Sequence, residues 1–386
     1  MCPASNGAVA LDEFLARLET YVNLDTPSGD KPALDLFSHR LKGEFEDAGC
    51  RVTVHERTGG NLLECRVGDG YRQILLLGHM DTVFPRGTAA TRPFSRVGDE
   101  LFGPGVLDMK SGVLMILEIL RYYADKLPAE WSLCALLNCD EEIGSRQSRE
   151  LIIGQAQESA ACLCMEPSKP GYCTVARKGM MTFQLKVKGV AAHSGVNYLT
   201  GHSAIQAIAR IIERLYALRD DEAGVSVNVG GLSGGAGRGN VVAESAELLG
   251  EARFYRPEDG ERLAQALEGI CADTGDPEVT TELAILSRRP PMQQTGASRA
   301  LYGLARRAAE RNGLSLGART HGGGSDGSLA ASTGIPVIDG MGAEGEFSHT
   351  EQEYVRADTL LNRIQTCIDL IGMLLEDQER GSASHE

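Results

Sequence analysis

The stretch QILLLGHMDTV, residues 73–83, decides how this chain folds. Its first half is a short, uninterrupted apolar run of the kind found in strands that are buried on both faces. The run ends in two polar side chains, His79 and Asp81. Two later apolar runs end in the same way, since SLCALLNC (132–139) precedes the acidic triplet at 140–142 and ACLCM (161–165) precedes Glu166. This repetition indicates neighbouring parallel strands that bring polar groups to one edge of a sheet.

Helical segments separate these apolar runs. Apolar residues recur at helical spacing over residues 11–22, and further helices are predicted at about 33–48 and 109–127, near 148, and at 357–376. Alternating strands and helices are typical of an α/β domain. We therefore predict a mostly parallel sheet covered on both faces, in three layers, with a ligand site beyond the carboxyl ends of its strands.

The pattern changes over residues 179–291. The segments MTFQLKVKG (181–189), VSVNVGG (225–231) and AELLGEARFY (246–255) alternate between polar and apolar residues, and a helix is predicted around residues 205–215. This pattern predicts an inserted α+β domain, an antiparallel sheet with helices on one side. The motif RRPP at 288–291 resembles a linker, after which strand and helix alternate again. We therefore assign residues 1–178 and 292–386 to one domain and 179–291 to an insertion.

Composition excludes several classes of protein. The chain has 386 residues with 38 Lys+Arg against 53 Asp+Glu, a formal charge of −15, which disfavours nucleic acids and anionic membranes as partners. It contains no apolar run long enough to span a membrane and starts without a recognisable secretion leader, so a cytoplasmic location is expected. The ten cysteines include no CxxC motif, and we expect buried thiols; the close pair Cys162 and Cys164 is not expected to bind metal.

The polar clusters at the strand ends carry the chemistry. Asp108, which opens a helix after the Gly-rich turn GPGVL, forms a fourth cluster beside His79, the acidic triplet and Glu166. Converging carboxylates repel one another and remain ionised only beside cations. Carboxylate oxygens mixed with imidazole nitrogen suit zinc, or cobalt and manganese. One such cluster alone is more often a polar turn, but four at successive strand ends indicate a metal centre, in which Asp81 could fix the tautomer of His79.

The same residues resemble a known family, the co-catalytic zinc exopeptidases and deacylases that include glutamate carboxypeptidase, acetylornithine deacetylase and aminoacylase. The resemblance extends nearly from end to end. Its landmarks are GHMDTV (78–83), GPGVLDMKSG (103–112), DEEIGS (140–145), MEP (165–167), AAHSG (191–195), GRGNVV (237–242), EARF (251–254), THGGGSD (320–326) and FSHTEQEYV (347–355).

This resemblance implies two zinc ions in a catalytic domain and a role for each candidate residue. Asp108 would bridge the metals, and each would have two further ligands: His79 and Glu166 for one, Glu142 and His349 for the other. Glu141 would be the general base and Asp81 the partner that orients His79. The peptide bond after Asp108 is often cis in this family, and Ser111 stands where the family commonly has Gly.

The resemblance also implies that the inserted domain serves as a dimerisation or lid domain. His193 would reach the active site of the opposite subunit, so that catalysis needs a homodimer. Four positions match residues that hold the substrate's carboxylate or backbone: Asn240, Arg253, Gly324 and Arg289. Lys178 is either a further site residue or a solvated strand end.

The predicted reaction is hydrolysis of an amide bond that releases a C-terminal amino acid, as in a glutamate carboxypeptidase. Two relatives of this function stay open: deacetylation of an N-acyl amino acid, and peptide binding without turnover. An unrelated alternative is a dinucleotide site, because Gly322, Gly324 and Gly327 satisfy GxGxxG. The helix that follows is very short, and the next strand ends at Asp339, only about 12 residues beyond the motif, which argues against this alternative.

Overall fold

The computed structural model describes residues 9–382 and divides the chain into two compact units. The first unit holds the described residues up to 176, 294–320 and those from 325 onward. The second unit holds residues 177–293 and 321–324. None of the helices within residues 9–382 is long and apolar enough to cross a membrane.

The first unit is built on a six-stranded sheet in the order β1-β2-β6-β3-β7-β14. Its strands are β1 (Arg51–His55), β2 (Leu62–Val67), β3 (Arg72–His79), β6 (Trp131–Asn138), β7 (Ser159–Cys164) and β14 (Val337–Ile338). The four strands β6, β3, β7 and β14 run parallel, whereas β2 pairs antiparallel with β6 and β1. The predicted α/β class with a mostly parallel sheet is confirmed.

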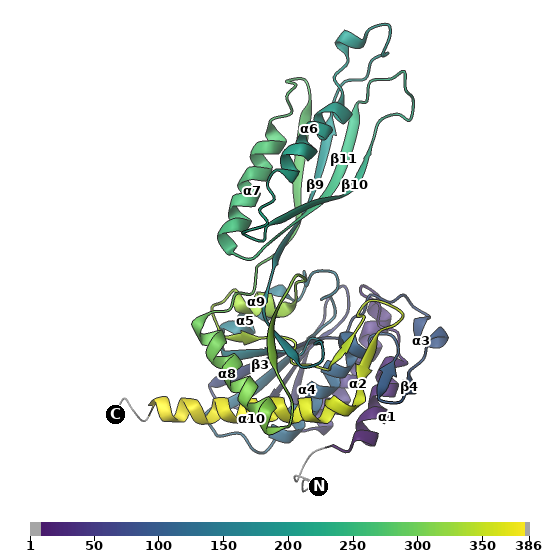
Figure 1. The fold of residues 1–386 in the computed structure, drawn as a ribbon. Helices are drawn as coiled ribbons and strands as arrows, with labels where there is room; N and C mark the ends of the chain where they lie inside the picture. The colour runs from purple at the N-terminus through teal and green to yellow at the C-terminus, as the bar shows by residue number, and fades with distance from the viewer. Residues whose placement is uncertain (1–8, 383–386) are drawn as a thin grey trace. The chain divides into compact units, whose positions relative to one another are not determined.

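Helices enclose this sheet (Figure 1). The helices of the first unit are α1 (Leu11–Val22), α2 (Lys31–Asp47), α4 (Ser111–Tyr123), α5 (Arg149–Gln157), α8 (Gly296–Arg311), α9 (Asp326–Ala331), α10 (Ala357–Ser382) and, at the periphery, the short α3 (Thr88–Thr91). Helix α4 packs against β2, β3 and β6, and α5 and α9 pack against β7. Every residue of β6 is buried, as its mostly apolar sequence predicts for a strand with both faces covered.

Two smaller sheets complete the first unit. One has the order β15-β16-β5-β4 and contains β15 (Gly345–Glu346), β16 (Tyr354–Arg356), β5 (Glu100–Phe102) and β4 (Ser95–Val97). Because β16 pairs with β5, the loop that carries His349 lies against the segment that leads to Asp108. The other sheet pairs β8 (Tyr172–Arg177) with β13 (Gly317–His321), so the strand predicted in SLGART exists outside the main sheet.

The second unit has an antiparallel sheet in the order β10-β11-β9-β12, as predicted. Its strands are β9 (Gly179–Lys188), β10 (Ser226–Gly234), β11 (Ser245–Phe254) and β12 (Thr280–Arg289), accompanied by α6 (Ala204–Tyr216), α7 (Pro257–Ala272) and the short turn η2 (Tyr198–Thr200). Alternate residues of β9 are buried, and α6 and α7 pack on the sheet, as Figure 1 shows. Phe183 is a fully buried member of the resulting core.

Two expectations at the level of single segments have clear outcomes. The prediction of a linker at 288–291 was wrong for its first two residues. Arg288 and Arg289 are the last residues of β12, and Arg289 is only 4% exposed. The pairing of β12 with β9 continues through these arginines, and the sequence pattern alone did not separate strand from linker. Buried thiols are confirmed for the nine described cysteines, whereas Cys2 lies outside the described residues.

Candidate active site

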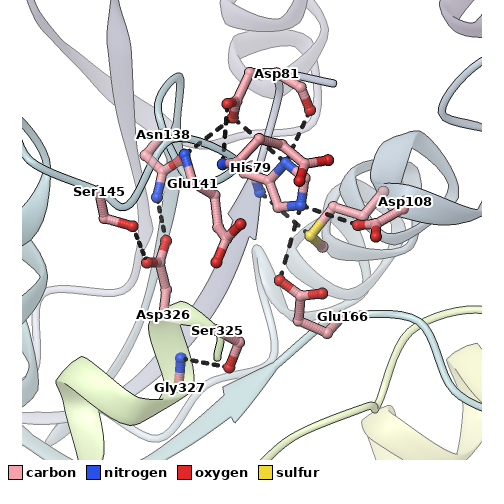
Figure 2. A network of polar contacts seen from close by, with 12 residues as sticks. His79, Asp81, Asp108, Asn138, Glu141, Ser145, Glu166, Ser325, Asp326 and Gly327 are labelled. Carbon is pink, nitrogen blue, oxygen red and sulfur yellow. Dashed lines mark hydrogen bonds and ion pairs between the residues drawn. The ribbon is translucent and has the colours of Figure 1, made fainter. Parts of the chain in front are cut away.

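The carboxyl ends of β3 and β7 and the helical turn η1 (Val106–Lys110) bring three predicted metal ligands together in the first unit. His79 is the last residue of β3, and its Nε2 lies 3.1 Å from Asp108 Oδ1 and 3.8 Å from Glu166 Oε1. Glu166 follows β7, whose Cys164 lies in register with Leu77 on β3. Figure 2 shows the side chains of Asp108 and Glu166 directed toward the imidazole of His79. All three residues are buried.

The other two predicted ligands lie on the opposite oxygen of Asp108. His349 Nε2 is 3.2 Å from Asp108 Oδ2 and 3.1 Å from Glu142 Oε2. Each oxygen of the Asp108 carboxylate therefore contacts a different imidazole. The five residues form one cluster with Asp108 at its centre.

The two loops that supply Asp108 and His349 have unusual backbones. The bond between Asp108 and Met109 is a cis peptide, in agreement with the resemblance. Phe347 and His349 both have left-handed backbone conformations, with φ of 65° and 67°, which are uncommon outside glycine. Such conformations concentrate at functional sites, where surrounding contacts compensate their cost.

Glu353 connects these two loops. Its Oε1 accepts hydrogen bonds from the backbone N–H groups of Leu107 (2.7 Å) and Asp108 (3.0 Å), and the residue is fully buried. Sequence reasoning missed Glu353 although it lies within FSHTEQEYV, because nothing in that motif distinguishes it from the exposed Glu351.

Asp81 does more than the predicted orientation of His79. The Nδ1 atom of His79 lies 2.9 Å from the backbone carbonyl oxygen of Asp81 and 3.4 Å from its carboxylate. A backbone carbonyl fixes the tautomer and orientation of an imidazole as a carboxylate does. The carboxylate instead accepts the backbone N–H groups of Glu141 and Glu142, both at 3.2 Å, and the hydroxyl of Ser28. Figure 2 shows the contacts of Asp81 with His79 and with Glu141.

Asp140, the third acid of the triplet, accepts hydrogen bonds that stabilise the local fold. The carboxylate of Asp140 accepts the backbone N–H of Gln147 (2.7 Å) and the hydroxyl of Ser148 (2.6 Å). Asp140 thus shapes the turn that follows β6, and Glu141 and Glu142 remain as the two acids that the turn presents to the cluster.

The charges in the cluster shift each other's pKa values. Hydrogen bonds to Asp108 and Glu142 raise the pKa of His349 to about 11. Burial acts to lower the pKa of His79, but hydrogen bonds to Asp108 and Asp81 outweigh it and raise that pKa well above its usual value. Burial raises the pKa of Glu142 to about 7, although the contact with His349 opposes it. The carboxylates therefore favour positive charge in their midst.

The donor set fits a divalent metal. Ligand atoms of His79, Asp108 and Glu142 lie within 4.8 Å of one another, and so do those of His79, Glu141 and Glu166. Glu142 Oε1 is buried and has no hydrogen-bond partner among residues 9–382, as expected for an oxygen that completes a metal coordination sphere. Mixed imidazole and carboxylate ligands suit zinc, cobalt or manganese. The geometry allows Glu141 to be either a ligand or a free base.

The predicted site residues of the second unit fall into pairs. The backbones of His193 and Val241 form an isolated bridge, and Ser194 N–H donates to Asn240 O at 3.0 Å, so His193 and Asn240 lie on adjacent segments and are both exposed. Gly324 lies against Arg289, since a Cβ placed on this glycine would be 2.7 Å from Arg289 Cδ.

Three further cations of the second unit, Arg253, Lys178 and Arg177, contact backbone carbonyls. Arg253 donates to Glu251 (2.6 Å) and to the carbonyl of Gly322 (2.5 Å). Lys178 donates to the carbonyl of Gly224 at 2.6 Å and lies over the ring of Tyr255, so it supports the second unit's own fold. Arg177, which sequence reasoning did not single out, is buried and donates to the carbonyls of Gly323 and Gly324. It fixes the glycine segment that follows β13.

Comparisons with known proteins agree with this arrangement. Residues 75–373 match the model of peptidase family M20/M25/M40. The chain is 28% identical over 368 residues to carboxypeptidase G2 of Pseudomonas sp. (strain RS-16), covering 92% of this chain and 87% of the relative. It is 26% identical over 380 residues to succinyl-diaminopimelate desuccinylase of Aromatoleum aromaticum, covering 93% and 95%.

A solved structure has the same fold. A tripeptidase from Staphylococcus aureus superposes with a TM-score of 0.78 at 22% identity, covering 96% of this chain and all of that one. The family model spans most of the chain, and its range includes all five clustered residues, so that sequence, fold and cluster support the same family. The chain belongs to peptidase family M20/M25/M40, a family of metal-dependent hydrolases.

Proposed function

We propose that this protein is a dinuclear metal-dependent amidohydrolase that releases a C-terminal amino acid from an acyl or aminoacyl group. One observation carries the proposal: His79, Asp108, Glu142, Glu166 and His349 form a single cluster with Glu141 beside it. The similarity to carboxypeptidase G2 supports an exopeptidase reaction.

In this proposal, the five clustered residues would hold two zinc ions. His79 and Glu166 would serve one ion, Glu142 and His349 would serve the other, and Asp108 would be available to both. When bound, the ions act as Lewis acids that acidify the attacking water and stabilise negative charge on the substrate oxygen. Cobalt or manganese could occupy the same donors.

Glu141 is the proposed general base. Its backbone is fixed by Asp81, and its carboxylate lies near His79 and Glu166 without a ligand role in the proposed pair of sites. It takes a proton from the attacking water and later delivers one to the leaving nitrogen. A positioned general base contributes about 10² to 10⁴ in rate.

The second unit supplies the proposed substrate contacts. Arg289 and Arg253 are the candidate partners of the substrate's free carboxylate, because guanidinium groups bind carboxylates in a bidentate manner. Gly324 lets the backbone approach the substrate, and Asn240 is a further polar contact.

His193 is proposed to act in the active site of a second subunit. It is exposed, and the segment after it carries three exposed apolar residues, Val196 (81%), Tyr198 (58%) and Leu199 (79%). Strand β10 is also an unpaired edge of its sheet and bears the exposed Leu232. Exposed apolar groups and a free strand edge favour association, which supports a homodimer.

A second candidate function is removal of an acyl group from an amino acid. The similarity to succinyl-diaminopimelate desuccinylase favours it, and the same cluster would serve both reactions. A peptide-binding protein without turnover is disfavoured, because all five candidate ligands and Glu141 are present. Assays of acyl-glutamate, N-succinyl and N-acetyl amino acids and simple dipeptides, with zinc or cobalt supplied, distinguish the reactions.

The decisive variant is Glu141→Gln. We expect kcat to fall by about 10² to 10⁴ while two metal ions per chain remain bound. Glu150→Gln, an exposed glutamate on α5, is the matched control and is expected to behave as wild type. Loss of one metal ion from Glu141→Gln would identify Glu141 as a metal ligand. Normal turnover of the variant with both metal ions bound would refute the mechanism.

A further inference from the structure

A buried carboxylate outside the ligand set joins the two ends of the loop that presents Glu141 and Glu142. Asp326 is the first residue of α9 and is 3% exposed. Its Oδ2 accepts a hydrogen bond from the side-chain amide of Asn138, and its Oδ1 accepts one from the hydroxyl of Ser145. Figure 2 shows both contacts, with Glu141 between the cluster and Asp326.

Asn138 and Ser145 bracket the loop. Asn138 is the last residue of β6, and Ser145 follows residues 139–144, which include Glu141 and Glu142. Ser145 is completely buried and has a left-handed backbone with φ of 53°. This conformation is unfavourable for a residue with a side chain, and a buried hydroxyl needs a hydrogen-bond partner. The contact with Asp326 supplies that partner at the point where the chain leaves the loop.

Further contacts of the loop come from Asp81 and from the loop itself. Asp81 accepts the N–H groups of Glu141 and Glu142, Asp140 accepts the N–H of Gln147, and Ser145 N–H donates to the carbonyl of Asp140. Asp326, from a segment 181 residues beyond Ser145, attaches both ends of this loop to α9. Because α9 itself packs on β3 and β7, it holds the loop in a fixed position relative to the strands that supply His79 and Glu166.

We propose that Asp326 is a positioning residue for the acidic loop, which sets the placement of Glu141 as base and of Glu142 as metal ligand. The inference rests on the proposed function for the roles of these two glutamates. Asp326 is not among the clustered donor atoms, so its effect is transmitted through Asn138 and Ser145.

The test compares Asp326→Ala, Ser145→Ala, the double variant and the conservative Asp326→Asn. We expect kcat to fall about 10- to 100-fold in Asp326→Ala with KM nearly unchanged, the range found when groups that orient metal ligands are removed. The double variant should be no worse than Asp326→Ala, because the serine acts through the same carboxylate. Asp326→Asn should recover part of the activity, since its amide oxygen can still accept from Asn138 while its amide nitrogen donates to Ser145.

Two readouts do not depend on turnover. Competition between the protein and a chelator for zinc should show weaker binding of one of two ions in Asp326→Ala, because Glu142 lies in the displaced loop. Hydrogen exchange should be faster at the amides of residues 139–148 than in wild type. Glu118→Gln, which alters a buried, ion-paired carboxylate on α4, is the control for general destabilisation and should leave both readouts unchanged.

The outcomes separate this inference from the proposed function. A folded Asp326→Ala whose kcat, zinc affinity and loop exchange stay within about twofold of wild type overturns it. The inference is also overturned if Glu118→Gln, at equal thermal stability, loses as much kcat and zinc affinity as Asp326→Ala. It is overturned as well if the effects of Asp326→Ala and Ser145→Ala on kcat are additive in the double variant. If wild type hydrolyses no amide substrate, the proposed function fails, whereas exchange in residues 139–148 still decides whether Asp326 fixes the loop.

Discussion

The carboxylate of Asp81 accepts the backbone N–H of Glu141 at 3.2 Å, while its own backbone carbonyl lies 2.9 Å from Nδ1 of His79. One residue therefore orients a candidate metal ligand and fixes the backbone of the proposed base. The motif GHMDTV at the end of β3 is thus linked directly to the acidic turn at the end of β6.

Replacement of Asp81 by asparagine tests this link. In Asp81→Asn, an amide nitrogen would face the N–H of Glu141 or Glu142, and two donors repel. We expect kcat/KM to fall about 10- to 100-fold with the fold retained, measured by steady-state kinetics and thermal unfolding. Asp30→Asn is a suitable control, because Asp30 caps α2 and asparagine caps a helix equally well. Wild-type kinetics in Asp81→Asn would contradict the link.

Metal content should follow the geometry of the cluster. Asp108→Ala should lose both ions, since each of its oxygens contacts a different imidazole, whereas His349→Ala should lose one. Elemental analysis after exhaustive dialysis measures this. Glu351→Ala, an exposed residue in the loop of His349, should keep both ions. Retention of two tightly bound ions by Asp108→Ala would show that the cluster is not the metal site.

The proposed role of His193 predicts complementation between inactive variants. A dimer of His193→Ala with Glu141→Gln contains one site with both residues intact. Random mixing after joint refolding should therefore restore about one quarter of wild-type activity. Mixing Glu141→Gln with Asp108→Ala should restore no activity, because each substitution inactivates the site of the subunit that carries it and neither site of the mixed dimer is intact. No recovery in the first mixture, with dimers present, would argue against action between subunits.

Neighbouring glycines allow a test of the proposed carboxylate contact. In Gly324→Ala the new methyl group would lie 2.7 Å from Cδ of the buried Arg289 and displace its side chain. We expect KM for substrates with a free carboxylate to rise about tenfold, the loss of one charge-assisted hydrogen bond, with a smaller change in kcat. Gly322→Ala is the control, because a methyl group there meets nothing within 4 Å. An equal rise in KM in Gly324→Ala and Gly322→Ala would contradict the proposal that Arg289 binds the substrate's carboxylate.

The cysteines should be unreactive in the folded protein. All nine described thiols are buried, and burial raises the pKa of Cys50, Cys134 and Cys367 to about 12. A Cys2→Ser variant should therefore react with a thiol reagent only on unfolding, when nine thiols per chain become available. Rapid reaction of any thiol in the native variant would indicate local opening of the core.

The fold class and most of the candidate ligands could be predicted from the sequence, because they depend on local pattern. The apolar runs of β3, β6 and β7 and the helical spacing of α1 are properties of consecutive residues. Parallel strands have their carboxyl ends on one edge, so the residues after these runs must converge. The arginines at 288 and 289 show the limit of this reasoning, because the polar end of a strand and a linker differ little in sequence.

Only the tertiary structure decided which polar groups serve the clustered residues. Glu353 bonds to the backbone of Asp108 across 245 residues, and Asp326 bonds to Ser145 across 181. Hydrogen bonds between such distant residues leave no periodicity in the sequence, because their partners are set by how helices and loops pack on the sheet. The sequence determined which residues lie at the strand ends, and packing determined which distant carboxylates fix them in place.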